Sequence, residues 1–207
     1  MSLHKKGSRN IGNFRSFTRF FPPKLIVMLC QISPGFTGCS EYFPTNIGDE
    51  VQHGFFNVKN IAMEETNVCV KRTFELTSLN DKDKPERLIQ HFQFLNWPNY
   101  GIPDAVGPIA NFIKLVHENG MNDPEFVIHC SGGIGRSGTF LTAYGVYSHY
   151  LKLLQIDDIC PPITQPLNLI ETVKSFRHQR HPWMVEGLRQ YEMAYDISLY
   201  LLNEITK

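Results

Sequence analysis

Residues 127–140 read VIHCSGGIGRSGTF, and this stretch fits two different anion-binding motifs. The residues from Gly133 to Gly138 have the spacing G-x-G-x-x-G of a turn that binds the pyrophosphate of a dinucleotide. Five residues separate Cys130 from Arg136, a spacing that suits a cysteine nucleophile and a guanidinium holding one anion between them. Both interpretations need a strand before the glycines and a helix after them. The stretch therefore predicts a strand–loop–helix unit.

The sequence around this stretch predicts an α/β fold. Residues 24–30, KLIVMLC, form a short apolar run of the kind expected for a strand buried on both faces. After Asp104 the apolar period changes from that of strands to that of helices. We expect a single domain with a central twisted mixed β-sheet flanked by α-helices. The expected strands are 24–30, 54–61, 67–79, 86–97 and 125–130, and the expected helices are 106–120, 135–154, 167–180 and 186–203.

Composition indicates an ordinary globular domain with no strong overall field. The 207 residues are 42% hydrophobic and 19% charged, and 20 Lys and Arg balance 20 Asp and Glu. We therefore expect no nucleic-acid partner and no membrane partner, and we expect a monomer. The five cysteines are an odd number without a C-x-x-C pair, which favours a reducing, cytoplasmic location without disulfides or a zinc site. No signal peptide is expected.

The dinucleotide interpretation has one further match and one mismatch. Asp157 and Asp158 lie about 20 residues beyond the glycines, where a dinucleotide site has its ribose-binding carboxylate. However, these aspartates end an expected helix instead of a second parallel strand, and no series of βαβ units follows. The sequence therefore favours the cysteine interpretation.

The cysteine interpretation gives a role to almost every residue of the loop. Backbone N–H groups in a nest, together with a helix N-terminus, bind a phosphate dianion, and the same environment lowers the pKa of the Cys130 thiol. Arg136 can hold two phosphoryl oxygens with its planar guanidinium. Ser137 places a hydroxyl where it can donate to the sulfur. The expected phosphate-binding residues are Ser131, Gly132, Gly133, Ile134, Gly135 and Arg136.

Several segments, in order, resemble protein tyrosine phosphatases. Residues 129–137 match the signature H-C-x-x-G-x-x-R-[ST] of that family. Residues 39–44, CSEYFP, resemble its K-C-x-x-Y-W-P, and residues 97–104, WPNYGIPD, resemble its mobile W-P-D-x-G-x-P-D loop. Residues 176–195 resemble its late R-x-x-R-x-x-M-V-Q-T-x-x-Q-Y segment. The resemblance implies a catalytic domain over 14–207, after a flexible N-terminus, 1–13, that opens with an added MSL remnant.

The resemblance also implies a reaction and roles for residues in it. Phosphotyrosine in proteins would be hydrolysed through a phosphocysteine on Cys130, with no metal or organic cofactor. Ser137 would assist the sulfur as it leaves, and Gln190 would position the water. His129, Trp97 and Tyr100 would support the substrate, with Trp97 anchoring the mobile loop and Tyr100 lying against the ring. For Arg177 and Arg180 we expect structural pairing in preference to substrate contact.

Four departures from the family pattern weaken the expected activity. Asn99 stands where the family has the aspartate that protonates the leaving group, and losing such an acid costs about 10²–10⁴ in rate. Asp104 is a possible substitute, or it caps the helix near Val106. Glu186 replaces a family glutamine and would repel phosphate unless it points away or acts as a base. The family's arginine-orienting glutamate has no counterpart in 32–38, and its K-N-R-Y segment has none near the N-terminus.

These departures leave three functions open. The chain is a phosphatase of low activity, a phosphotyrosine-binding protein that shields its partner without hydrolysis, or a phosphatase for an RNA 5′-phosphate or a phosphoinositide. The departures also resemble those of the rapidly diverging phosphatase copies carried by viruses of parasitoid wasps, which would place the protein in a host cytoplasm.

Overall fold

The computed structural model describes residues 23–32, 39–80, 86–120, 126–157 and 167–206. This described part contains six strands and four helices, which confirms the expected α/β class with a mixed sheet. It forms two compact units. The sheet unit comprises the described residues of Met1–Leu95 and Asn122–Ser131, and the helical unit those of Asn96–Met121 and Gly132–Lys207. The expected N-terminus (1–13), the start of the family resemblance at Phe14, Asp158 and Cys160 lie outside the described residues. Most of the connection between the strands expected at 67–79 and 86–97, where the polar residues 80–85 predict a hairpin turn, also lies outside them.

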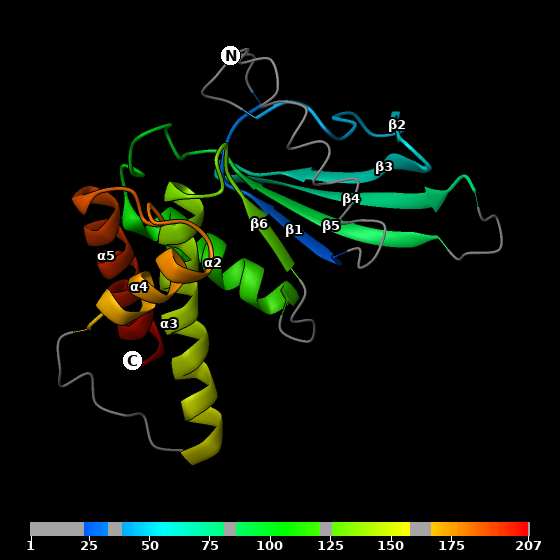
Figure 1. Cartoon of the computed structure of the whole chain (residues 1–207). Helices are drawn as coiled ribbons and strands as arrows, with labels where there is room; N and C mark the ends of the chain where they lie inside the picture. The colour runs from blue at the N-terminus through cyan, green and yellow to red at the C-terminus, as the bar shows by residue number, and fades with distance from the viewer. Residues whose placement is uncertain (1–22, 33–38, 81–85, 121–125, 158–166, 207) are drawn as a thin grey trace, which may run out of the picture. The chain divides into compact units, whose positions relative to one another are not determined.

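The sheet unit has the strand order β2-β3-β4-β5-β1-β6, and Figure 1 shows the strands side by side. The strands are β1 (Leu25–Met28), β2 (Glu50–His53), β3 (Phe56–Glu65), β4 (Cys69–Ser78), β5 (Arg87–Phe94) and β6 (Phe126–His129). Strands β2 to β5 pair antiparallel, whereas β1 pairs parallel with both β5 and β6. All four residues of β1 are buried, as its apolar run predicts for a strand with a neighbour on each side.

One strand was not expected from the sequence. Strand β2 has only four residues, EVQH, and lies at the edge of the sheet, paired with β3 alone. Its first three residues are exposed or half-buried, so it shows no clear apolar alternation. The turn into β3 contains Gly54 at φ 61°, a left-handed conformation that glycine adopts without a steric cost. The other expected strands are confirmed as β1, β3, β4, β5 and β6.

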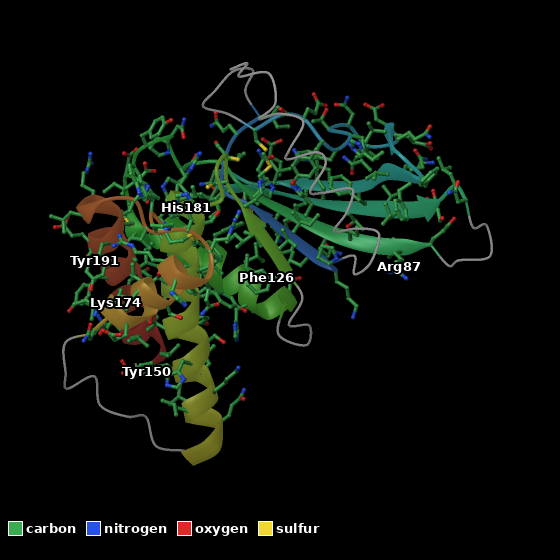
Figure 2. The ribbon with its side chains drawn as sticks, viewed as in Figure 1. Arg87, Phe126, Tyr150, Lys174, His181 and Tyr191 are labelled. Atoms are coloured by element: carbon green, nitrogen blue, oxygen red, sulfur yellow. The ribbon has the colours of Figure 1, made fainter. Side chains whose placement is uncertain are left out.

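The helical unit contains α2 (Val106–Gly120), α3 (Gly135–Asp157), α4 (Ile170–Gln179) and α5 (Leu188–Ile205). Helix α2 has the expected bounds, including the stop at Gly120. Helix α4 begins three residues later than expected because the Asn168 side chain accepts a hydrogen bond from the Ile170 amide, at 3.0 Å. Helix α5 packs on α2 and α3 through apolar residues of one face, which include Ile197 and Leu201. Figure 2 shows Lys174 on α4 and Tyr191 on α5.

No described helix is both long enough and apolar enough to cross a lipid bilayer.

Candidate active site

The strand–loop–helix unit predicted from residues 127–140 is present. Strand β6 ends at His129 and α3 begins at Gly135, where the Gly138 amide donates to the Ile134 carbonyl at 2.9 Å. Gly133 has φ 66°, so the loop uses a glycine where the backbone turns left-handed. In the first turn of α3 there is no acidic residue, which leaves its positive end without a local counter-charge from the helix itself.

The residues of this loop belong to both units. His129, Cys130 and Ser131 end the sheet-unit segment, and Cys130 is buried with 5% of its surface exposed. Arg136 and Ser137 start α3 in the helical unit and are also buried. The hydroxyl oxygen of Ser137 has no hydrogen-bond partner among the described residues. Binding of phosphate by the loop amides stays a prediction.

The dinucleotide interpretation is not supported. Helix α3 continues to Asp157, and the described elements after it are the helices α4 and α5. A dinucleotide fold places its ribose-binding carboxylate after a second parallel strand, and Asp157 is instead the last residue of a helix.

The guanidinium of Arg136 is held by the loop that starts at Trp97. Its Nη2 donates to Asn99 Oδ1 at 2.9 Å, and its Nη1 lies 3.4 Å from the Trp97 carbonyl oxygen. The Asn99 side-chain amide nitrogen is buried and has no partner among the described residues. Asn99, at the position of the family's acid, thus directs its side-chain oxygen at Arg136. Its amide N–H group can donate a hydrogen bond but cannot transfer a proton.

The side chain of Trp97 makes a hydrogen bond within its own loop, and its role as anchor of a mobile loop stays a prediction. It is buried, and its Nε1 donates to the Gly101 carbonyl at 3.1 Å, while the Gly101 amide donates to the Pro98 carbonyl at 3.3 Å. Tyr100 lies between them at φ 58° and is 76% exposed. Asp104 is exposed and precedes α2 by two residues. The substrate-facing role of Tyr100 and the acid role of Asp104 stay predictions.

Gln190 and Glu186 both lie against the start of α3. Gln190 Oε1 accepts a hydrogen bond from the Glu186 backbone amide at 2.8 Å, and Thr139 Oγ1 donates to the Gly135 carbonyl at 3.1 Å and lies 3.5 Å from Gln190 Oε1. A Cβ at Gly135 would lie 2.8 Å from Gln190 Oε1 and 3.1 Å from Glu186 Oε2. The Glu186 carboxylate therefore does not point away from the loop. Thr139 was missed in the sequence because the family signature ends at Ser137.

The backbone that carries Glu186 is fixed by Arg177. Arg177 Nε donates to the Met184 carbonyl at 3.0 Å and its Nη2 donates to the Val185 carbonyl at 3.1 Å, which confirms the structural role expected for it. Val185 has φ 60°, an outlier for a β-branched residue, and costs of order 1–3 kcal/mol. The loop begins at His181 (Figure 2), whose carbonyl accepts from the Met184 amide. Arg180 instead brings its Nη2 within 3.7 Å of where a Cβ at Gly133 would lie.

Replacing Gly138 by Ala should destabilise the helical unit. A Cβ there would lie 2.6 Å from the backbone nitrogen of Val185, so α3 or the Val185 backbone must shift. We expect the free energy of unfolding to fall by about 1–3 kcal/mol, measured as a fall in Tm of roughly 2–4 °C per kcal/mol. Gly145→Ala is the matched control in the same helix, because no atom lies within 4 Å of its Cβ position. The control should gain up to about 1 kcal/mol, and equal Tm changes in both variants would contradict the close approach.

In the sheet unit, the half-buried His129 is joined by hydrogen bonds to the buried side chains of Tyr42 and His91. Tyr42 Oη lies 2.6 Å from His129 Nε2 and 3.1 Å from His91 Nε2, and His129 Nδ1 lies 3.2 Å from the Cys130 carbonyl oxygen. Because a carbonyl oxygen only accepts, His129 Nδ1 carries the proton and Nε2 accepts from the Tyr42 hydroxyl. His91 Nε2 then donates to Tyr42, and His91 Nδ1 has no partner among the described residues.

Burial favours the uncharged forms of Tyr42 and His91 in this group of hydrogen-bonded side chains. Burial lowers the pKa of His91 well below its usual value, and the nearby His129 lowers it further. Burial also raises the pKa of Tyr42 well above its usual value, with added effects from Cys39 and Cys30. The side chains of His91 and Tyr42 are therefore both uncharged near pH 7. His91 was missed in the sequence because it lies far along the chain from Tyr42 and His129, in no motif with either.

The sequence of this protein is similar to those of known tyrosine phosphatases. The family described as protein-tyrosine phosphatase matches residues 23–200. Tyrosine-protein phosphatase 2 of Dictyostelium discoideum is 33% identical over 187 residues, covering 88% of this chain and 46% of that protein. Tyrosine-protein phosphatase non-receptor type 9 of Rattus norvegicus is 30% identical over 171 residues, covering 76% of this chain and 26% of that protein. The chain thus spans between about a quarter and about a half of these relatives.

Proposed function

This chain belongs to the protein-tyrosine phosphatase family, and we propose that it hydrolyses phosphotyrosine in proteins through a phosphocysteine on Cys130. The observation that carries the proposal is the buried Arg136, whose guanidinium is held by Asn99 Oδ1 and the Trp97 carbonyl at the start of α3. A fixed, buried cation at a helix N-terminus is the environment that a phosphate dianion requires. The proposed catalytic domain is residues 14–207.

In the proposed first step, the Cys130 thiolate bonds to phosphorus and the bond from phosphorus to the phenolic oxygen breaks. Arg136 and the amides of residues 131–136 hold the other phosphoryl oxygens. The leaving phenolate takes its proton from water, because the Asn99 amide cannot supply one. In the second step, water placed by Gln190 attacks phosphorus, the S–P bond breaks with help from Ser137, and phosphate leaves.

The same geometry supports slow turnover. The Glu186 carboxylate lies at the first turn of α3, where it competes with a bound phosphate for the positive end of the helix. Arg180, whose Nη2 lies beside Gly133, offsets part of that negative charge. The Gln190 Oε1 atom is already engaged by the Glu186 amide, so only the Nε2 side of its amide group is left to orient water.

A second candidate function is binding of phosphotyrosine proteins without hydrolysis. It is favoured by Asn99, because an amide in hydrogen-bond contact with Arg136 keeps the binding geometry while removing the proton donor. In both candidates the partner is a phosphotyrosine-containing protein, and no cofactor takes part.

A substrate comparison tests the proposed function. We expect phosphate release from a phosphotyrosine peptide, blocked by vanadate, at a rate at least tenfold above that from a matched phosphoserine peptide. Tight binding of the phosphotyrosine peptide without release would favour the second candidate. Faster release from a phosphoinositide or an RNA 5′-phosphate than from the phosphotyrosine peptide would overturn both.

A further inference from the structure

Three potential metal ligands meet in the sheet unit, and one of them, His129, precedes the proposed nucleophile Cys130 in the sequence. The Sγ atoms of Cys30 and Cys39 and one ring nitrogen of His129 all lie within 4.8 Å of one another. Both cysteines are almost fully buried, at 1% and 3% exposed, and neither is in a disulfide. The sequence did not indicate this cluster, because a spacing of nine positions does not resemble a C-x-x-C pair.

Backbone pairing fixes all three ligands. Cys30 lies two residues after the end of β1, and His129 is the last residue of β6, which pairs parallel with β1. The Leu29 amide donates to the His129 carbonyl at 2.9 Å, which joins the two segments beside the cluster. The Cys39 amide lies 3.4 Å from the Gln31 carbonyl oxygen, which places Cys39 next to the same segment. The cluster is thus part of the folded sheet edge and is not a chance approach of side chains.

The tautomer of His129 is the one that a metal ligand needs. Its Nδ1 carries the proton toward the Cys130 carbonyl oxygen at 3.2 Å, so the lone pair is on Nε2. Histidines that bind metals commonly donate their other ring N–H to a backbone carbonyl in this way. In this structure the Nε2 lone pair accepts from the Tyr42 hydroxyl at 2.6 Å. The phenol oxygen is therefore positioned beside the same site.

The donor set and its charge select the metal. Two thiolates and one imidazole are soft or borderline ligands of the kind that Zn²⁺ prefers over Mg²⁺ or Ca²⁺. Two thiolates cancel the two charges of the ion, so the buried complex is neutral overall and avoids the cost of an isolated buried charge. In tetrahedral zinc sites with bonds of about 2.0–2.3 Å, ligand atoms lie roughly 3.3–3.8 Å apart. The cluster therefore needs to contract by no more than about 1.5 Å.

We propose that Cys30, Cys39 and His129 Nε2 bind one Zn²⁺ ion. The ion displaces one proton from each thiol, and the Tyr42 hydroxyl or a water molecule takes the fourth position. His129 is also a residue of the phosphatase signature, but the proposal does not depend on the proposed function, because metal binding is measured on a chain that lacks the Cys130 thiol.

The test is a Co²⁺ titration of the reduced full chain carrying Cys130→Ser, which removes the thiol of the proposed nucleophile. We expect one equivalent of Co²⁺ to give sulfur-to-cobalt charge-transfer absorption and tetrahedral d–d bands, and Zn²⁺ to displace it. Adding Cys30→Ser or Cys39→Ser should weaken binding by roughly 100-fold or more. The control is Cys69→Ser, because Cys69 is another buried cysteine, on β4, whose sulfur lies 3.5 Å from Thr66 Oγ1. It should leave binding unchanged.

A second measurement uses the unmutated cluster, so it does not depend on whether the serine variants fold. Zn²⁺ should raise the Tm of the Cys130→Ser chain in a concentration-dependent way, and EDTA should reverse the rise. Absence of both the thiolate absorption and the Tm rise would overturn the proposal. Equal loss of binding in Cys69→Ser and Cys30→Ser would also overturn it.

Discussion

Cys130→Ser should reduce phosphate release from an aryl phosphate by about 10⁴–10⁶, the range seen when the nucleophile of a covalent mechanism is removed. A serine hydroxyl at this position is not ionised near neutral pH and is a far weaker nucleophile than a thiolate. The side chain is 5% exposed and the change is nearly isosteric, so the fold should be retained. The measurement is steady-state release together with a thermal melt of both proteins.

The control for this variant is again Cys69→Ser, which exchanges a buried thiol at a distance from the loop and should leave the rate within about twofold. Binding provides a second readout. The Cys130→Ser chain should still bind a phosphotyrosine peptide, because Arg136 and its contacts with Asn99 and Trp97 are untouched. Retention of more than about 1% of the rate would contradict a phosphocysteine mechanism.

Asn99→Asp should raise kcat on a phosphotyrosine peptide by about 10²–10⁴, the contribution of a positioned general acid. One carboxyl oxygen can keep the 2.9 Å contact with Arg136 Nη2. The other then occupies the place of the Asn99 amide nitrogen, which has no partner among the described residues and so has room for a protonated oxygen. The gain should appear in kcat more than in KM, because the proton is transferred only in the transition state.

The pH dependence separates a new acid from an unspecific gain. The parent chain should show no fall in kcat on the alkaline side that depends on residue 99, because an amide does not titrate. Asn99→Asp should introduce such a fall, since only the protonated carboxyl donates. Asp104→Asn is the control: it should leave the parent rate unchanged, and a loss of rate would assign the acid role to Asp104. An unchanged or lower kcat in Asn99→Asp would contradict the role given to this position.

Local patterns in the sequence predicted most of the fold. Helix α2 was expected at its observed bounds because its apolar residues keep a helical period up to Gly120. Strand β1 was expected from an uninterrupted apolar run, and all of it is buried. Strand β2 was missed because four residues at a sheet edge, mostly exposed, carry no period that distinguishes them from a loop.

The candidate site was only partly predictable, because contacts between distant segments leave no local pattern. The family signature predicted Cys130 and Arg136 as site residues. The other family motifs, found in the expected order along the sequence, predicted Trp97 and Gln190. Whether Glu186 points toward or away from α3 was left open by the sequence. It is decided by the backbone at Val185, whose left-handed conformation is held by Arg177. The Tyr42–His91–His129 chain likewise joins three segments that are 49 and 87 residues apart.

The contact between Asn99 and Arg136 has an electrostatic consequence. An ionised aspartate there would neutralise the guanidinium, whereas the amide fastens it without cancelling any charge. Arg136 therefore presents its whole positive charge to an incoming dianion. Under the proposed function, the substitution that removes the general acid would also strengthen the electrostatic attraction of the site for a phosphorylated partner. Release of a bound phosphorylated partner would then be slow.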